Sequence, residues 1–221
     1  MSKKFKAIVI DNQNNEFSRK ISELDTTQLK DGNVLVKIDY SGLNYKDALI
    51  LKDGGRIVKN YPFVPGIDFS GVVEESEDNK FKKGDRVILT GFRVGEIYYG
   101  GFSQYAKVNS DFLVKAPNNL TNHQSMMMGT AGLTALLCAF AIKAKEELLL
   151  GEKVKDVLVT GATGGVGSVA VMVLNKMGYT VHAVTGKKDK HDYLKNLGAT
   201  HILDRSEFLG ESKLLEKGIW D

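Results

Sequence analysis

The segment from residue 155 to 204 constrains the fold most, because strand-like and helix-like runs alternate in it at the spacing of a parallel sheet. Its elements follow in the order strand, glycine turn, helix, strand, helix, strand, over residues 155–160, 161–167, 168–178, 179–185, 189–198 and 199–204. Parallel strands joined by helices form right-handed units with helices on the sheet faces. The segment therefore predicts an α/β fold with a doubly wound parallel sheet.

The chain before this segment has a different pattern. Short apolar runs rich in β-branched residues recur from residue 6 to 108, and glycines stand at their ends, as turns between antiparallel strands require. In VLVKIDY the alternation puts Val36, Ile38 and Tyr40 on one face of a strand. Thr121 and Gln124 have the spacing of a capping box that opens a long apolar helix. We predict a small, bent β domain over residues 1–120 and a second domain over 121–221.

The glycine turn from Gly161 to Gly167 stands directly between an apolar strand and an apolar helix. A phosphate binds well at such a place, because backbone N–H groups and the positive end of the helix dipole face it. Gly164 and Gly165 would let the backbone approach a ligand, and Gly167 would let the helix pack closely on the strand. Ala162 stands where the dinucleotide fingerprint usually has its first glycine. We interpret the turn as a pyrophosphate site; the alternative is a glycine-rich turn without a ligand.

The end of the second strand selects between NAD and NADP, because an acidic residue there binds the ribose 2′-hydroxyl of NAD. Here the sequence is Thr185-Gly186-Lys187-Lys188, with two ammonium groups and no carboxylate. Ammonium groups suit a 2′-phosphate. The pattern predicts NADPH; the alternative is that both lysines are solvated at the start of a helix.

Charge and cysteine content exclude several classes of function. A formal net charge of +3 with interspersed signs is not typical of a nucleic-acid or anionic-membrane binder. Cys138 lies in an apolar run, where we expect a buried, inert thiol, and one cysteine with four scattered histidines predicts no metal site. The apolar run after the N-terminus ends at Asp11, too short for a signal peptide or a membrane span. We expect a cytoplasmic protein that acts on a small molecule.

Several segments together resemble a known family, the zinc-free quinone oxidoreductases of the medium-chain dehydrogenase/reductase superfamily, and within it the acrylyl-CoA reductase (YhdH/YhfP) group. The segments are SGLNYKDALI at 41, PFVPGIDFSGVV at 62, KGDRVILTG at 83, YGGFSQYAKV at 99, MGTAGLTA at 128 and TGATGGVGSVA at 160. The resemblance implies a GroES-like catalytic domain, a Rossmann domain, NADPH as hydride donor and, in the family, a homodimer. Zinc-dependent relatives have Gly-His-Glu where this chain has Gly66-Ile67-Asp68.

The resemblance also implies site residues. For the cofactor these are Tyr45 near the nicotinamide, Thr163, Gly164, Gly165 and Val166 at the pyrophosphate, and Thr185, Gly186, Lys187 and His201 at the 2′-phosphate. For catalysis we expect Tyr45 to position the nicotinamide and substrate, and Asn44 or a water to hydrogen-bond the substrate carbonyl. The alternatives are ordinary turn residues at 44 and 45 and a solvent-facing helix start at Lys46 and Asp47. Asp68 is a weaker candidate for a functional role; the alternative is that it only pairs with a buried backbone amide beside the cleft.

Three functions remain open at this stage. The first is an NADPH-dependent reductase of acrylyl-CoA-like enoyl thioesters, and the second is a reductase of quinones or enones by the same chemistry. The third is an inactive fragment that at most binds nucleotide, because the pattern predicts three of the six strands of a dinucleotide-binding sheet, the N-terminal half of the Rossmann domain.

Overall fold

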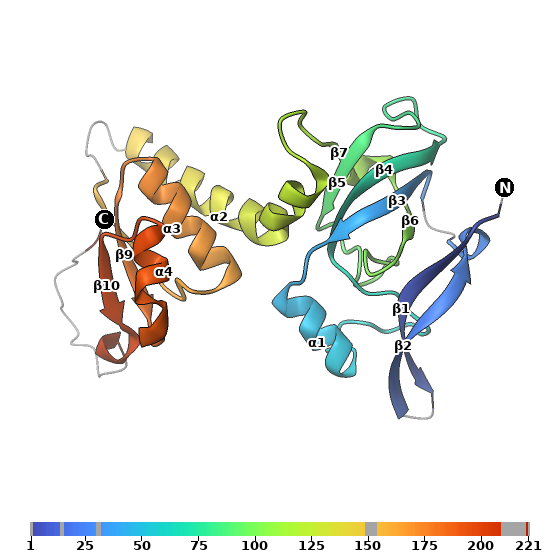
Figure 1. Ribbon diagram of the computed structural model, residues 1–221, viewed down its shortest axis with the longest axis horizontal. Coiled ribbons are helices and arrows are strands. Elements are labelled where there is room, and N and C mark those ends of the chain that lie inside the picture. Colours follow the sequence, from blue (N-terminus) through green and yellow to red (C-terminus); the bar gives the residue numbers. More distant parts are fainter. Residues whose placement is uncertain (1, 14–15, 30–31, 149–153, 209–219, 221) are drawn as a thin grey trace. The chain divides into compact units, whose positions relative to one another are not determined.

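The computed structural model describes residues 2–13, 16–29, 32–148, 154–208 and 220 (Figure 1). Contacts within the chain divide it after Thr130 into two compact units, which we describe one at a time. This division lies inside helix α2 (Asn122–Leu148). The boundary predicted between residues 120 and 121 lies at the start of that helix and stays a prediction.

Unit 1 is built on an antiparallel sheet of five strands in the order β6-β3-β4-β5-β7. The strands are β3 (Val34–Ser41), β4 (Asp68–Ser76), β5 (Arg86–Thr90), β6 (Tyr105–Val108) and β7 (Val114–Lys115). The first four confirm strands expected from the apolar runs. The alternation in β3 is incomplete: Val36 is buried but Tyr40 is largely exposed, because the pairing of β3 with β4 is irregular between Ile38 and Tyr40.

A hairpin and a short helix complete unit 1. Strand β1 (Lys4–Gln13) pairs along its length with β2 (Glu16–Asp25), which lies in a segment that we did not predict as a strand. Helix α1 (Tyr45–Asp53) ends at Gly54, whose φ of 80° is the left-handed conformation that glycine adopts without strain. Ile10 and Ile50 are fully buried beside Phe63, so β1 and α1 share one core.

Two of the segments that carry the family resemblance pack against each other, backbone on backbone. Gly101 N–H donates to the oxygen of Gly66 at 2.8 Å, and Phe102 N–H donates to the oxygen of Pro65 at 2.9 Å. A Cβ atom on Gly66 would lie 2.5 Å from the nitrogen of Phe102, and one on Gly100 would lie 2.3 Å from the oxygen of Gly66. The glycines are therefore required by packing.

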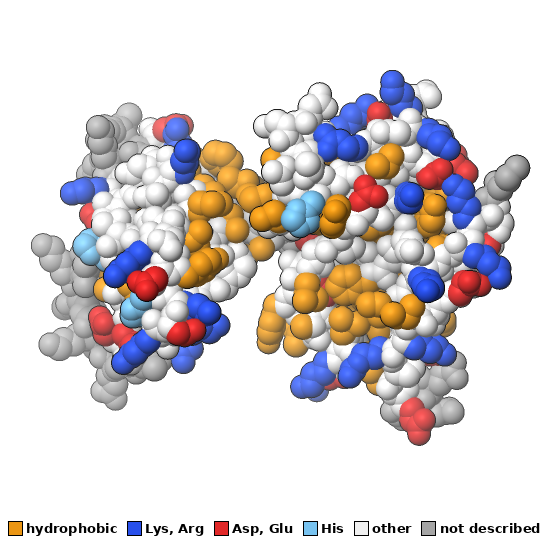
Figure 2. Space-filling view, in the orientation of Figure 1, with side chains coloured by type: hydrophobic (Ala, Val, Ile, Leu, Met, Phe, Trp, Pro, Cys, Tyr) orange, Lys and Arg blue, Asp and Glu red, His pale blue; other side chains and the backbone are white. Residues whose placement is uncertain are grey.

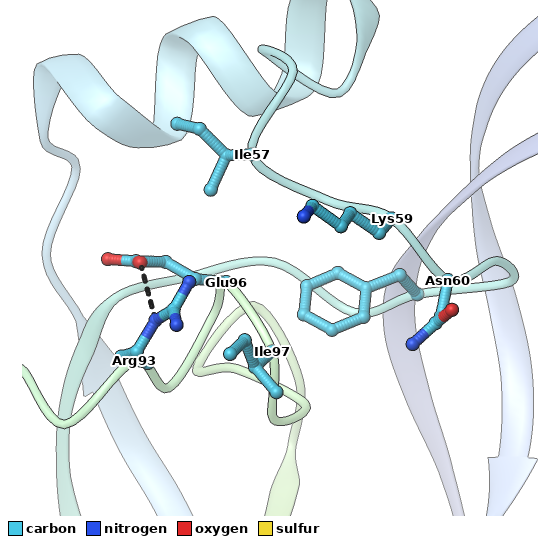
Figure 3. A pocket seen from close by; sticks show the side chains of 7 residues that line it. Ile57, Lys59, Asn60, Arg93, Glu96 and Ile97 are labelled. Carbon is cyan, nitrogen blue, oxygen red and sulfur yellow. Dashed lines mark ion pairs between the residues drawn. The ribbon is translucent and has the colours of Figure 1, made fainter.

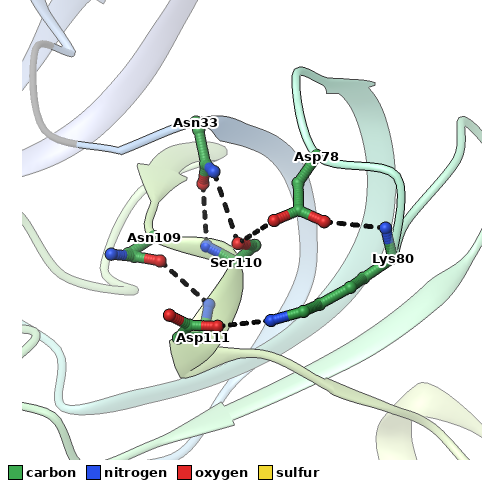
Figure 4. A network of polar contacts seen from close by, with 6 residues as sticks. All are labelled: Asn33, Asp78, Lys80, Asn109, Ser110 and Asp111. Carbon is green, nitrogen blue, oxygen red and sulfur yellow. Dashed lines mark hydrogen bonds and ion pairs between the residues drawn. The ribbon is translucent and has the colours of Figure 1, made fainter.

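A polar network fixes the far end of the sheet (Figure 4). The short helix η2 (Ser110–Phe112) belongs to this network. A second short helix, η1 (Thr26–Gln28), follows β2 elsewhere in the unit. Ser110 N–H donates to Oδ1 of Asn33 at 2.8 Å, and the Ser110 hydroxyl donates to Oδ2 of Asp78 at 2.6 Å. That hydroxyl is the main cause that lowers the pKa of Asp78. We assign this cluster a structural role.

Unit 2 contains the predicted parallel sheet, with strand order β10-β9-β8. Its elements are β8 (Asp156–Val159), α3 (Gly165–Lys176), β9 (Thr180–Thr185), η3 (Lys188–Lys190), α4 (His191–Asn196), β10 (His201–Asp204) and η4 (Arg205–Phe208). Val157, Val181 and Ala183 of the sheet form one core with Val171 of α3 and Leu194 of α4. The β-α-β-α-β order is confirmed.

Helix α2 begins as the sequence predicts and is broken at one glycine. Thr121 and Gln124 form the reciprocal capping box: Gln124 N–H donates to the Thr121 hydroxyl at 3.1 Å, and Thr121 N–H to the Gln124 side chain at 2.9 Å. Gly129 has the non-helical angles φ 47° and ψ −152°. By length and composition alone the stretch Asn122–Lys145 could cross a membrane, a property that core helices share.

The burial expected for Cys138 is wrong, because the residue is exposed. Ala135 and Ala139 form the side of α2 that faces the core of unit 2, and Cys138 does not lie on it. The neighbouring Leu137 and Phe140 are also largely exposed, and apolar side chains cover the α2 and α3 side of this unit in Figure 2. An apolar run therefore does not bury every residue in it.

Candidate functional site

The glycine turn of unit 2 leads directly into the N-terminus of α3. Gly161 has a φ of 58°, and Gly164 N–H donates to its oxygen at 2.9 Å, which closes the turn. Gly164 stands at the N-cap position without a side chain that could cap the helix. The first N–H groups of a helix have no partner inside it. A phosphate bound at this turn would accept the first N–H groups of α3.

The glycines of the turn serve two different purposes. A Cβ atom on Gly167 would lie 2.4 Å from the oxygen of Gly161, so this glycine lets α3 pack against the turn. A Cβ atom on Gly165 would meet only the Cβ of Ala131, at the ordinary contact distance of 3.4 Å. Packing within the chain therefore does not explain Gly165. The open space at Gly165 fits a ligand that approaches the backbone, as a dinucleotide pyrophosphate does.

The end of β9 lies at the same edge of the sheet as this turn. Ala162 N–H donates to the oxygen of Val184 at 3.2 Å, which joins the turn to the residue before Thr185. Thr185 is buried, and its hydroxyl accepts the N–H of Lys187 at 3.1 Å. Gly186, Lys187 and Lys188 are exposed. The structure thus brings the predicted residues at 163–166 and at 185–187 to one edge.

His201 does not lie at that edge, contrary to its predicted place at the 2′-phosphate. It pairs in register with His182 in the middle of β9 and stacks on the His182 ring at 4.5 Å, while Asp204 pairs with Thr185. His201 and Asp204 are three steps apart along the strand, about 10 Å at roughly 3.3 Å per residue. His182 in turn contacts Oδ1 of Asp156 at 2.8 Å. His201 therefore belongs to a cluster on the face of the sheet.

Arg205 is the cation that the sequence reasoning missed at this edge. Its Nε and Cβ atoms lie 3.9 Å from the position that a Cβ of Gly186 would occupy. The adjacent Asp204 carboxylate accepts both the N–H and the hydroxyl of Ser206, at 2.8 and 2.7 Å. The only signal in the sequence was the register of two parallel strands, which places residue 205 one step beyond Thr185.

In unit 1 the predicted catalytic residues stand at the start of α1. Asn44 is the N-cap residue, with the extended angles φ −112° and ψ 160°, and Tyr45 is the first residue of the helix. Tyr45 is 81% exposed, so its phenol is open to a ligand. The side-chain amide of Asn44 donates to Oδ2 of Asp68 at 3.0 Å. Asn44 is therefore held in place, whereas Tyr45 is not packed in a turn.

Asp47 is buried, which excludes for this residue the alternative of a solvent-facing helix start. Its carboxylate accepts Asn44 N–H at 2.8 Å and Ile67 N–H at 3.0 Å. Burial raises the pKa of the Asp47 carboxyl above its ordinary value of 3.8, and the charge of Asp68 adds a smaller rise. Lys46 forms an ion pair with Glu96 at 2.6 Å. The first turn of α1 is thus tied to two distant segments.

Asp68 is a buried carboxylate with three hydrogen-bond donors. Its Oδ1 accepts Gly42 N–H at 3.0 Å, and its Oδ2 accepts the Asn44 amide and the N–H of Thr130 at 2.8 Å. The contacts agree with the alternative reading of Asp68, a carboxylate paired with backbone amides, although Gly42 and Thr130 are only partly buried. Within the part of the chain that the structure describes, no three side chains of His, Cys, Asp or Glu could hold a metal ion. Asp68 instead fixes the backbone around the candidate catalytic segment.

The chain is similar to known proteins in sequence and in structure. The alcohol dehydrogenase GroES-like domain matches residues 30–118. The chain is 48% identical to acrylyl-CoA reductase AcuI of Ruegeria pomeroyi over 219 residues, which are 98% of this chain and 66% of that protein. The curated relatives are therefore longer than this chain.

Two solved structures are similar over nearly the whole chain. YhdH of Salmonella enterica in complex with NADP is 45% identical, with a TM-score of 0.90 over 97% of this chain and 65% of that chain. YhfP of Bacillus subtilis with NAD bound is 42% identical, with a TM-score of 0.92 over 99% of this chain and 66% of that chain. YhfP carries the name of a quinone oxidoreductase. The chain belongs to the medium-chain dehydrogenase/reductase superfamily, with the acrylyl-CoA reductases and YhfP as close homologues.

Proposed function

We propose that this chain binds NADPH and takes part in reducing the activated C=C bond of an acrylyl-CoA-like enoyl thioester. The open phosphate site at Gly165, next to the N-terminus of α3, carries the nucleotide part of the proposal. The 48% identity to an acrylyl-CoA reductase supports the substrate class. Cytoplasmic location and a homodimer belong to this proposal on the family resemblance alone.

The choice of NADPH rests on the charges at the end of β9. Arg205 lies beside Gly186, and Gly186 is followed in the chain by Lys187 and Lys188. The carboxylate of Asp204 accepts a hydrogen bond from Ser206 N–H. Guanidinium and ammonium groups bind a phosphate through charge-assisted hydrogen bonds. One similar structure contains NADP and another contains NAD. A titration of the chain with both reduced nucleotides decides: we expect tighter binding of NADPH, and equal affinities would refute the choice.

The chemistry needs a donor for the substrate oxygen. NADPH supplies a hydride for the β-carbon of the thioester, and the resulting enolate needs hydrogen-bond donors at its oxygen and a proton at its α-carbon. The exposed phenol of Tyr45 can donate one such bond. The Asn44 amide has two N–H bonds, of which Asp68 holds one, so the other is left for a carbonyl or a water.

Steady-state reduction of acrylyl-CoA tests the roles of these two side chains. We expect Tyr45→Phe and Asn44→Ala to lower kcat/KM by about a hundredfold, the lower range for loss of a positioned proton donor. Tyr193→Phe is the matched control, because Tyr193 is an exposed tyrosine of unit 2. Wild-type values in both site variants would refute the assignment.

Reduction of a quinone is the second candidate, favoured by 43% identity to YhfP over the whole of this chain. The same assay with a quinone in place of acrylyl-CoA separates the two substrates by their kcat/KM values. NADPH binding without turnover of either substrate would favour the third function, a nucleotide-binding fragment.

A further inference from the structure

Unit 1 contains a pocket of about 180 Å³, lined in part by the segment that follows α1 (Figure 3). One wall is the segment that follows α1, with Ile57, Lys59 and Asn60, and the facing wall is the loop with Arg93, Glu96 and Ile97. The buried ring of Phe63 also lines it. Binding sites for whole ligands usually have roughly 300–1,000 Å³. This pocket therefore suits one part of a longer ligand.

The loop that forms the facing wall has a fixed backbone. Phe92 and Arg93 have φ angles of 52° and 63°, which non-glycine residues adopt only at a cost in free energy. The oxygen of Arg93 accepts the N–H groups of Glu96 at 3.1 Å and Ile97 at 2.9 Å. A Cβ on Gly95 would lie 2.5 Å from the oxygen of Gly66, so the loop is packed onto the segment of residues 65–68. These contacts hold in place the backbone that carries the side chains of this wall.

The charges around the pocket leave an excess of cations. Glu96 is mostly buried and contacts both Lys46 at 2.6 Å and Nε of Arg93 at 3.5 Å. The guanidinium has five N–H donors, so one shared carboxylate cannot occupy all of them. Lys59 forms no ion pair with any residue that the structure describes, and it is exposed. Two cations at the rim, next to apolar Ile57, Phe63 and Ile97, match a ligand with an anionic group attached to an apolar arm.

We propose that this pocket holds the phosphate-bearing part of a coenzyme A thioester, with Lys59 and Arg93 as the phosphate contacts. This inference rests on the proposed function and deepens it. Lys46 follows Tyr45 directly and contacts Glu96 in the pocket wall, so the pocket lies close to the predicted catalytic segment. A long thioester reaches both places, whereas a small neutral quinone has no group for the two cations.

Calorimetric titration of the 221-residue chain with coenzyme A tests the pocket. We expect Lys59→Gln to raise the dissociation constant about tenfold, as loss of one charge-assisted hydrogen bond does. The double variant Lys59→Gln/Arg93→Gln should lose more and should also flatten the dependence of binding on salt. Pantetheine, which lacks the phosphates of coenzyme A, should bind wild type and variants equally. Lys82→Gln is the control for a lost surface charge, on a turn outside the pocket.

The outcomes distinguish a failure of the proposed pocket from a failure of the proposed function. Coenzyme A binding that is unchanged in Lys59→Gln and in the double variant would overturn the pocket, while acrylyl-CoA reduction in the same preparation would leave the proposed function standing. A chain that binds NADPH and reduces a quinone but binds no coenzyme A would overturn both. Lys59 has no ion-pair partner among the described residues, so a loss of affinity in that single variant is not a folding defect; equal thermal midpoints check this.

Discussion

The carboxylate of Asp68 accepts the backbone N–H of Thr130 at 2.8 Å, across 62 residues of chain. Thr130 follows Gly129, where α2 is broken, so Asp68 caps the helical stretch that resumes there. The same oxygen accepts the amide of Asn44. One buried carboxylate thus holds both the candidate catalytic segment and the backbone at the end of unit 1.

We predict that Asp68→Asn destabilises the protein by about 1–3 kcal/mol, the penalty for leaving a buried donor unsatisfied. Donors face both oxygens of Asp68, and an amide keeps only one oxygen. Urea unfolding followed by circular dichroism measures the loss. Asp111→Asn, at an exposed ion pair with Lys80, is the control and should leave the midpoint unchanged. Equal midpoints for both variants would contradict this role of Asp68.

The raised pKa of Asp47 predicts a pH dependence of stability. Below the ordinary value of 3.8 the carboxyl is protonated in both the folded and the unfolded chain. As pH rises from there to the raised pKa, the unfolded chain releases its proton first, so the free energy of unfolding falls. Above the raised pKa the loss is constant. Urea midpoints across this window should depend less on pH in Asp47→Asn than in wild type; parallel profiles would contradict the assignment.

The two glycines of the nucleotide turn should respond differently to the same substitution. Gly167→Ala places a Cβ 2.4 Å from the oxygen of Gly161 and should destabilise the protein by about 1–3 kcal/mol, as overpacking does. The Cβ of Gly165→Ala has room within the chain, so we expect a native unfolding midpoint. The same Cβ would keep a phosphate from approaching the backbone, so we expect the NADPH affinity to fall about tenfold, the contribution of one charge-assisted hydrogen bond. Unfolding and nucleotide titrations on both variants give the comparison. Native NADPH affinity in Gly165→Ala would argue against a phosphate at this turn.

Arg205 and His201 make a second matched pair. Arg205→Gln should weaken binding of NADPH about tenfold and leave that of NADH unchanged, because only the 2′-phosphate needs the charge. His201→Gln should change neither affinity, since His201 stacks on His182 away from this edge. Fluorescence titration with each nucleotide gives the four values. Loss of NADPH affinity in His201→Gln alone would show that the register argument is misleading.

The sequence predicted those elements whose periodicity is set by one buried face. The three strands of the parallel sheet, strands β3 to β6 of the five-stranded sheet and the capping box at Thr121 are of this kind. Strand β2 was missed because its residues are mostly polar and exposed, so that pairing with β1 and not burial defines it. Cys138 was misjudged because composition indicates an apolar helix but not which of its sides faces the core.

The parts of the candidate site whose positions depend on one short segment could be predicted from the sequence. The glycine turn and the exposed Tyr45 are local features. The burial of Asp47 depends on Ile67, twenty residues away, and the place of Arg205 depends on how β10 aligns with β9. A charged residue in the first turn of a helix gives no sign by itself that a distant backbone amide will cover it.

The contact between Gly66 and Gly95 limits how the pocket that we propose for coenzyme A can change shape. No side chain fits between these backbones, so the loop that carries Arg93 has no room to move closer or to be repacked. Variation in selectivity must then come from the side chains mounted on the fixed loop and on the segment facing it. Substitutions that test the proposed coenzyme A pocket should therefore be made at residues 59, 93 and 97 and leave the glycines unchanged.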